Sequence, residues 1–296
     1  MAVRVARTFR RPSFIGALIL SGALSGALAQ SSGSPAPPGE PRPLGDATPI
    51  APLRPITTET PPFAAPQPMS AQCAVPAADI AAPAPLPNVV TILTEKKPLR
   101  ILAIGSSSTS GVGASSRSRT YPSQLGDILK RALKGSDVEI INRGVGGEVA
   151  ATTAERLRSE VAVARPDLVL WQLGTNDALS RVPVEEFDKT VRSTVAWLRE
   201  NKIDVVLVGL QYTPKFARDD SYIAIRDDLF RIASEENILY VRRYNAMQFI
   251  ESARNAHLTG PDDLHQNDLG YRCMAEHVAQ AVIANLFVRR FRPATN

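Results

Sequence analysis

The chain has 296 residues, 44% of them hydrophobic, which is enough for one large or two small domains. Its 34 Lys and Arg against 29 Asp and Glu give a formal net charge of +5. Four of the basic residues, all arginines, lie in the first 29 positions, and the remaining 30 basic residues balance 29 acidic ones. Because nucleic-acid binders neutralise phosphates with surplus positive charge, this balance argues against a nucleic-acid partner.

Residues 1–29 have the pattern of a secretory signal peptide. Arginines come first, an apolar run from Phe14 to Leu28 follows, and Ala27-Leu28-Ala29 forms a small-x-small cleavage site. The apolar run is short for a membrane span, although an uncleaved anchor is the alternative. We therefore expect a periplasmic or secreted protein without stable membrane insertion after cleavage.

Residues 30–97 form a Pro/Ala-rich segment. Seventeen of the 24 prolines fall between residues 31 and 98, and the segment has neither helical nor alternating periodicity. Such a composition buries too little apolar surface to offset the entropy of ordering, so we expect a largely disordered linker. Residues 88–93, at its end, have the pattern of a short strand packed on the domain. Residues 98–296 remain for one compact domain.

The two cysteines are Cys73, in the linker, and Cys273, in the last expected helix. In an exported protein two cysteines can pair, which would clamp the proline-rich segment onto the domain. Two unpaired thiols are the alternative.

Five short apolar runs alternate with segments of helical periodicity after residue 98. The expected strands are residues 99–104, 138–142, 168–173, 205–210 and 238–241. The expected helices are residues 121–132, 150–161, 184–198, 222–232, 247–256 and 271–286. This alternation predicts an α/β domain with a parallel sheet covered on both faces.

Chemically useful residues gather in three turns after strands and in one late loop. The segments are residues 105–111 (Gly-Ser-Ser-Ser-Thr-Ser-Gly), 142–148 (Asn-Arg-Gly-Val-Gly-Gly-Glu), 174–177 (Gly-Thr-Asn-Asp) and 261–265 (Pro-Asp-Asp-Leu-His). Together they offer a hydroxyl nucleophile, backbone and amide donors, and a carboxylate three residues before an imidazole. Acyl transfer needs these parts: a base to activate serine, a carboxylate to orient the base, and donors for an oxyanion.

Other glycine-rich sites do not fit. A nucleotide P-loop needs a lysine after its last glycine, and a dinucleotide fingerprint needs glycine where Val149 stands. An α/β-hydrolase elbow needs glycine at Thr109. The three histidines are not spaced as metal ligands, so we expect no metal site.

The four segments, in this order, resemble the blocks of the SGNH (GDSL-type) hydrolase family. The resemblance implies serine esterase or lipase chemistry, without a metal or organic cofactor, on a flavodoxin-like, three-layer α/β/α fold. With the five strands expected above, the sheet would be five-stranded and mostly parallel. It also implies Ser107 as the nucleophile, His265 as the base and Asp262 as its orienting carboxylate. The oxyanion hole would be formed by the backbone N–H groups of Ser107 and Gly147 and by the side-chain amide of Asn176.

One departure leaves the assignment open. The family usually has aspartate before the nucleophile, whereas this chain has Ser106. Ser106, Ser108 and Ser110 are therefore alternatives to Ser107 as the nucleophile. Asp263 competes with Asp262 in the same way. His257 and His277 lack a carboxylate three residues earlier and are interpreted as ordinary surface or helix residues.

The functional hypothesis is an exported serine esterase that removes small acyl groups, such as acetyl, from a small-molecule or saccharide ester. An O-acyltransferase would use the same acyl-enzyme with an alcohol acceptor. A saccharide-binding protein with an idle catalytic set is the third hypothesis.

Overall fold

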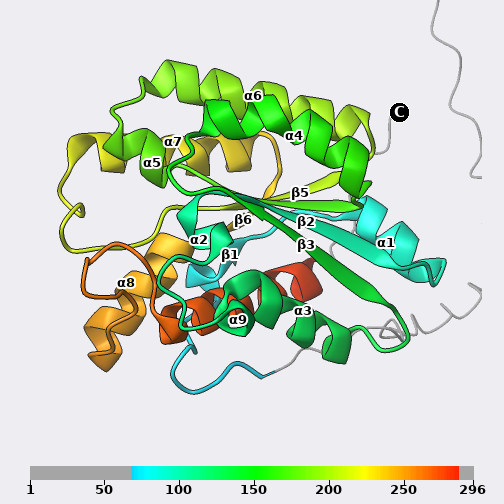
Figure 1. Cartoon of the computed structure of the whole chain (residues 1–296), viewed down its shortest axis with the longest axis horizontal. Helices are drawn as coiled ribbons and strands as arrows, with labels where there is room; N and C mark the ends of the chain where they lie inside the picture. Colours follow the sequence, from blue (N-terminus) through cyan, green and yellow to red (C-terminus); the bar gives the residue numbers. More distant parts are fainter. Residues whose placement is uncertain (1–67, 287–296) are drawn as a thin grey trace, which may run out of the picture. The chain divides into compact units, whose positions relative to one another are not determined.

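The structure is a computed structural model that describes residues 68–286 (Figure 1). The predicted signal peptide and residues 30–67 of the predicted linker lie outside the described residues. Within residues 68–286, no helix combines the length and the apolar character that crossing a bilayer requires.

A six-stranded sheet has the order β1-β6-β5-β4-β2-β3. Its five parallel strands are β2 (Leu99–Gly105), β3 (Val138–Gly144), β4 (Leu168–Gln172), β5 (Asp204–Val208) and β6 (Leu239–Val241). These five have the flavodoxin-like order, so the predicted fold class is confirmed. The sheet has six strands rather than five because β1 (Ala81–Ala82) pairs antiparallel with β6. A two-residue strand of alanines has no periodicity from which it could be predicted.

Helices cover both faces of the sheet. Figure 1 shows α4, α6 and α7 on one side and α3 and α9 on the other. Their bounds are α3 (Tyr121–Ala132), α4 (Ala150–Ala164), α6 (Val184–Glu200), α7 (Asp220–Glu235) and α9 (Asp268–Asn285). The shorter elements are η1 (Ala77–Asp79), α1 (Pro87–Thr94), α2 (Ser107–Ser110), η2 (Arg117–Arg119), α5 (Thr175–Leu179) and α8 (Arg243–Arg254). Two apolar cores, one on each face, result from this arrangement.

Residues 68–97 are packed on the domain, contrary to the predicted disordered linker. Residues 88–93 belong to helix α1 rather than to a strand. Pro87 suits the first helical position, and the carboxylate of Asp204 accepts the backbone N–H groups of Asn88 and Val89 at 2.8 and 2.9 Å. Val89 and Leu93, four residues apart, are buried in the core. Long-range contacts thus order a segment whose composition favours disorder.

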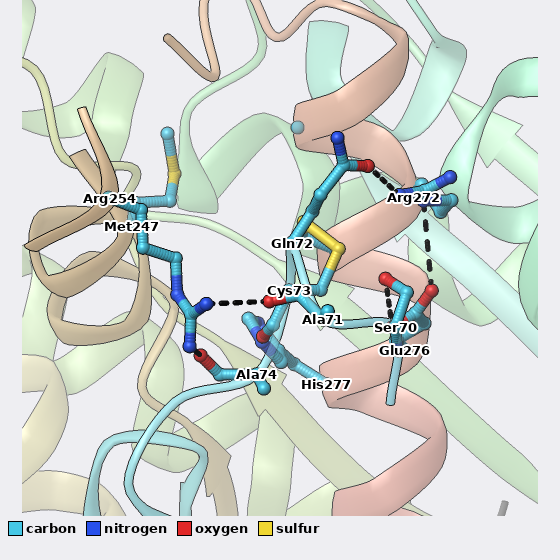
Figure 2. The surroundings of a disulfide bond; sticks show 12 residues. Ser70, Ala71, Gln72, Cys73, Ala74, Met247, Arg254, Arg272, Glu276 and His277 are labelled. Carbon is cyan, nitrogen blue, oxygen red and sulfur yellow. Dashed lines mark hydrogen bonds and ion pairs between the residues drawn. A yellow bond between two sulfur atoms is a disulfide. The ribbon is translucent and has the colours of Figure 1, made fainter. Parts of the chain in front are cut away.

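A disulfide joins Cys73 to Cys273 in α9, the pairing that the sequence analysis anticipated (Figure 2). Polar contacts to the segment of residues 70–74 surround it. The Ser70 N–H and hydroxyl donate to Glu276 at 2.7 and 3.0 Å, and Arg254 donates to the carbonyls of Ala71 and Ala74 at 2.7 Å each. The segment is therefore fixed to α8 and α9 at several points.

Candidate active site

Three turns that follow neighbouring strands meet at one edge of the sheet. In the parallel register, Gly105 at the end of β2 pairs with Gly144 of β3 on one side and with Gln172 of β4 on the other. The segments that follow these residues contain Ser107, Gly147 and Asn176, respectively. Carboxyl ends of adjacent parallel strands form the usual ligand crevice of this fold.

The four serines of residues 106–110 differ in what their hydroxyls do. Ser107, the first residue of α2, is half-buried, and its hydroxyl forms no hydrogen bond with any described residue. The other three hydroxyls are engaged: Ser106 donates to Gln172 Oε1 at 3.0 Å, Ser108 accepts from Arg243 Nη2 at 2.9 Å, and Ser110 donates to the Ser107 carbonyl at 3.0 Å. Among these four serines, only the Ser107 hydroxyl has no hydrogen-bond partner in the described residues. Its backbone N–H, in the first turn of α2, has no partner within the helix.

The glycine turn after β3 lies beside Ser107. A Cβ atom built on Gly146 would lie 4.0 Å from the Cβ of Ser107. Gly147 has φ +84°, a left-handed conformation that glycine adopts without strain, and a Cβ built there would meet no atom within 4 Å. The backbone of Gly147 thus borders open space next to the serine.

Asn176 joins the second and third turns. Its Nδ2 donates to the backbone carbonyl of Glu148 at 2.8 Å, one residue beyond Gly147. This bond uses one of the two amide hydrogens, so the second remains available to a ligand. The predicted oxyanion donors Gly147 and Asn176 are therefore brought together.

Two carboxylates outside the predicted catalytic set stabilise these turns. Glu148 pairs with Arg156 through two hydrogen bonds of 2.6 and 2.7 Å. Asp177, which is buried, accepts the N–H of Ala150 at 2.8 Å and that of Gly174 at 3.1 Å. Burial raises the pKa of Asp177 against the opposing effect of these hydrogen bonds.

Asp262 and His265 form a hydrogen-bonded pair. Asp262 Oδ2 lies 2.5 Å from His265 Nδ1, and Oδ1 accepts the N–H groups of His265 and Leu264 at 2.9 and 3.1 Å. Burial alone would raise the pKa of Asp262, but the hydrogen bonds from His265 and Leu264 outweigh it and lower the pKa to about 2. Asp262 is thus a carboxylate at neutral pH. Asp263, with φ +54°, forms no such pair.

The loop of His265 packs against the turn that follows α2. A Cβ built on Gly113 would come within 3.3 Å of the His265 Cβ and 2.5 Å of the Gln266 carbonyl oxygen, so only glycine fits there. The Tyr271 hydroxyl donates to the Val112 carbonyl at 2.6 Å. Six residues after Ser107, the chain is therefore in contact with the loop that holds the imidazole.

Arg243, also missed by the sequence analysis, lies beneath α2. It is 2% exposed, donates to Ser108, and has no hydrogen-bond partner among the described residues for Nε and Nη1. Burial lowers its pKa to about 10, against the opposing effect of nearby tyrosine side chains. In the sequence, Arg242-Arg243 is typical of a solvated pair, so nothing indicated a buried cation.

The remaining histidines have structural or surface positions, as interpreted from the sequence. His257 is exposed, whereas His277 is buried with its Nε2 2.7 Å from the Cys73 carbonyl oxygen. In the part of the chain that the structure describes, no three His, Cys, Asp or Glu side chains are grouped as ligands of a metal ion.

Comparison with known proteins identifies the family. A model of the non-GDSL lipase-like family matches residues 72–287. The chain belongs to this family.

Relatives of the chain include named esterases. An arylesterase of Vibrio mimicus is 24% identical over 192 residues, 63% of this chain and 90% of that protein. Esterase TesA of Pseudomonas aeruginosa is 26% identical over 117 residues, 39% of this chain and 56% of TesA. A solved two-domain esterase, active on acetylated mannans and crystallised with mannopentaose, has the same fold, with a TM-score of 0.61 and 21% identity. The similarity covers 74% of this chain and 60% of that one.

Proposed function

We propose that the protein is an exported serine esterase that hydrolyses esters of small acyl groups, such as acetyl. The enzyme class, a carboxylic ester hydrolase, follows from the family and from the two relatives named as esterases. The catalytic residues, the acyl group and export are our proposals.

The observation that carries the proposal is the free hydroxyl of Ser107. Three neighbouring serines use their hydroxyls within the fold, whereas that of Ser107 is available at the start of α2. The Asp262–His265 pair, in a loop that contacts the turn after α2, supplies the base that a serine nucleophile needs.

The reaction follows the acyl-enzyme route. Ser107 Oγ attacks the ester carbonyl carbon while His265 Nε2 takes its proton and Asp262 stabilises the resulting imidazolium. The carbonyl oxygen becomes an oxyanion that accepts hydrogen bonds from the N–H groups of Ser107 and Gly147 and from the Asn176 amide. His265 then protonates the leaving alcohol. Water, deprotonated by His265, cleaves the acyl-enzyme and restores Ser107.

Export is supported by two separate features. Residues 1–29 have the pattern of a signal peptide, and the Cys73–Cys273 disulfide is of a kind that persists in oxidising compartments. Cell fractionation with intact-mass measurement tests this, since a mature chain lacking residues 1–29 is expected outside the cytoplasm.

The test of the chemistry is hydrolysis of p-nitrophenyl acetate by variants. Ser107→Ala and His265→Ala are expected to lose nearly all activity. Ser110→Ala, which removes an exposed hydroxyl on the same short helix, is the matched control and is expected to keep it. Labelling by a fluorophosphonate probe should map to Ser107. Full activity in both Ser107→Ala and His265→Ala would refute the proposal.

A further inference from the structure

The buried side chain of Gln211 connects two segments of the candidate active site. Gln211 follows β5 and is 2% exposed. Its Oε1 accepts a hydrogen bond from the Thr175 hydroxyl at 2.9 Å, and its Nε2 donates to the Leu264 carbonyl at 3.3 Å. Thr175 directly precedes Asn176, and Leu264 directly precedes His265. One side-chain amide therefore joins the segment of an oxyanion donor to the segment of the base.

The two peptide groups before His265 are each held from both sides. The Leu264 carbonyl accepts the bond from the buried amide, while the N–H of the same peptide, that of His265, donates to Asp262 Oδ1 at 2.9 Å. In the preceding peptide, the Asp263 carbonyl accepts from the Thr213 hydroxyl at 2.6 Å, and the N–H donates to Asp262 Oδ1 at 3.1 Å. Asp262 thus stabilises the turn from within, whereas the two side chains after β5 fix it to the sheet.

The turn of Asn176 packs against the same segment after β5. A Cβ atom built on Gly174 would lie 2.4 Å from Leu210 Cδ1, so this turn and the Leu210 side chain are in close contact. Thr175, which is buried, then donates to Gln211. The oxyanion turn and the histidine loop therefore take their relative position from residues 210–213.

The environment of Gln211 strengthens its hydrogen bonds. An amide that is buried without partners costs free energy, and here both ends of the amide are paired. Residues 205–210, which precede it, form an apolar run, so an apolar side chain would fill the position without needing partners. Because the site is closed to water, no solvent competes for the two bonds.

We propose that Gln211 is a positioning residue that fixes the base His265 relative to the oxyanion donor Asn176. It touches no reacting atom and acts through Thr175 and Leu264. The inference rests on the proposed function, because it takes His265 as the base and Asn176 as an oxyanion donor. Displacing a reacting group by about 1 Å can cost about 100-fold in rate, so the bonds of one buried amide are enough to affect turnover.

The experiment uses near-isosteric variants of the full-length protein. Gln211→Met removes both hydrogen bonds of the amide, and Thr175→Val removes the bond on the oxyanion side. Asn285→Leu and Thr194→Val are the matched controls, since each removes a buried polar side chain that is bonded within its own helix, α9 or α6. Hydrolysis of p-nitrophenyl acetate is measured well below the Tm of each variant, and thermal unfolding is measured beside it.

Gln211→Met and Thr175→Val are expected to lower kcat about 10- to 100-fold and to leave KM within about twofold. The rate at which a fluorophosphonate probe labels Ser107 should fall in parallel, because the same base and oxyanion donors serve that reaction. The two controls are expected to lower Tm but to keep the wild-type kcat. If Gln211→Met does not fold, Thr175→Val, which removes a single hydroxyl, decides the question.

A kcat within about twofold of wild type in the folded variants of Gln211 and Thr175 would overturn the inference. An equal loss of kcat in the two controls would also overturn it, because the effect would then follow from lost stability. So would a rise in KM without a fall in kcat, which marks a lost substrate contact rather than a displaced base. Hydrolysis of p-nitrophenyl acetate that survives in Ser107→Ala would instead overturn the proposed function.

Discussion

His265 donates both its backbone N–H and its side-chain Nδ1–H to one carboxylate, that of Asp262, three residues earlier. Oδ1 caps the turn through the backbone N–H groups, and Oδ2 faces the imidazole Nδ1. The position of the ring therefore depends on Asp262 and not on its neighbour Asp263.

Asp262→Asn and Asp263→Asn form a matched pair that tests this dependence. Asp262→Asn is expected to lower kcat for p-nitrophenyl acetate about 1,000- to 10,000-fold, because the imidazole loses the carboxylate that fixes its tautomer. Asp263→Asn should keep kcat, since asparagine tolerates the left-handed backbone at this position. A larger loss in Asp263→Asn would assign the orienting role to Asp263.

The pKa of Asp262 predicts a difference in acid stability. Its folded pKa of about 2 lies below the ordinary value of 3.8, so its contribution to stability is present above pH 3.8 and is lost as pH falls through 2. The side chain is 50% exposed, which limits the contribution to about 1 kcal/mol or less. Wild type and Asp262→Asn should thus differ in Tm at pH 5 and converge toward pH 2, as measured by thermal unfolding. A difference in Tm that stays constant down to pH 2 would contradict the folded pKa.

Asn176→Ala is expected to lower kcat for p-nitrophenyl acetate about 100- to 1,000-fold with little change in KM, because the amide serves the transition state. Its bond to the Glu148 carbonyl is lost as well, so the unfolding midpoint is measured beside the kinetics. Asn201→Ala, at the end of α6, is the control and should keep wild-type kcat. A rise in KM without a fall in kcat would argue against an oxyanion role.

The Cys73–Cys273 disulfide closes a loop with a sequence separation of 200 residues. In the chain-entropy model, such a crosslink stabilises the fold by about 5 kcal/mol. The double variant Cys73→Ser/Cys273→Ser should therefore unfold at a lower urea concentration than wild type. Wild type measured with a reductant should approach the double variant. Identical midpoints with and without reductant would show that the crosslink contributes nothing.

His277 makes the attachment of residues 70–74 sensitive to pH. Burial lowers the pKa of His277, partly offset by its bond to the Cys73 carbonyl and by Glu276 nearby, so the folded state favours the neutral ring. A lowered folded pKa means that stability is complete above pH 6.5 and declines as pH falls below it. Between pH 7 and pH 5, the Tm of wild type should fall more than the Tm of His277→Gln. The glutamine keeps a hydrogen-bond donor but does not titrate. Equal pH dependence would contradict this reading.

The sequence by itself determined the scaffold and the parts of the site. Apolar runs and helical periodicity are local properties, and they specified all five parallel strands and the main helices. The observed start of a helix differs from the expected one where a capping residue sets it. Helix α9 begins at Asp268 rather than at residue 271, because the Asn267 side chain accepts the N–H of Gly270 at 3.0 Å. The four polar segments after residue 98 could also be identified from the sequence, because residue types and spacing define them.

Only the tertiary structure decided among chemically equal residues. Four serines within residues 106–110 have the same reactivity in a free chain, and partners from β4 and α8, Gln172 and Arg243, occupy the hydroxyls of two of them. Helix α1 and the buried Arg243 likewise depend on residues more than 100 positions away. These contacts join residues far apart in the sequence, so no local pattern encodes them.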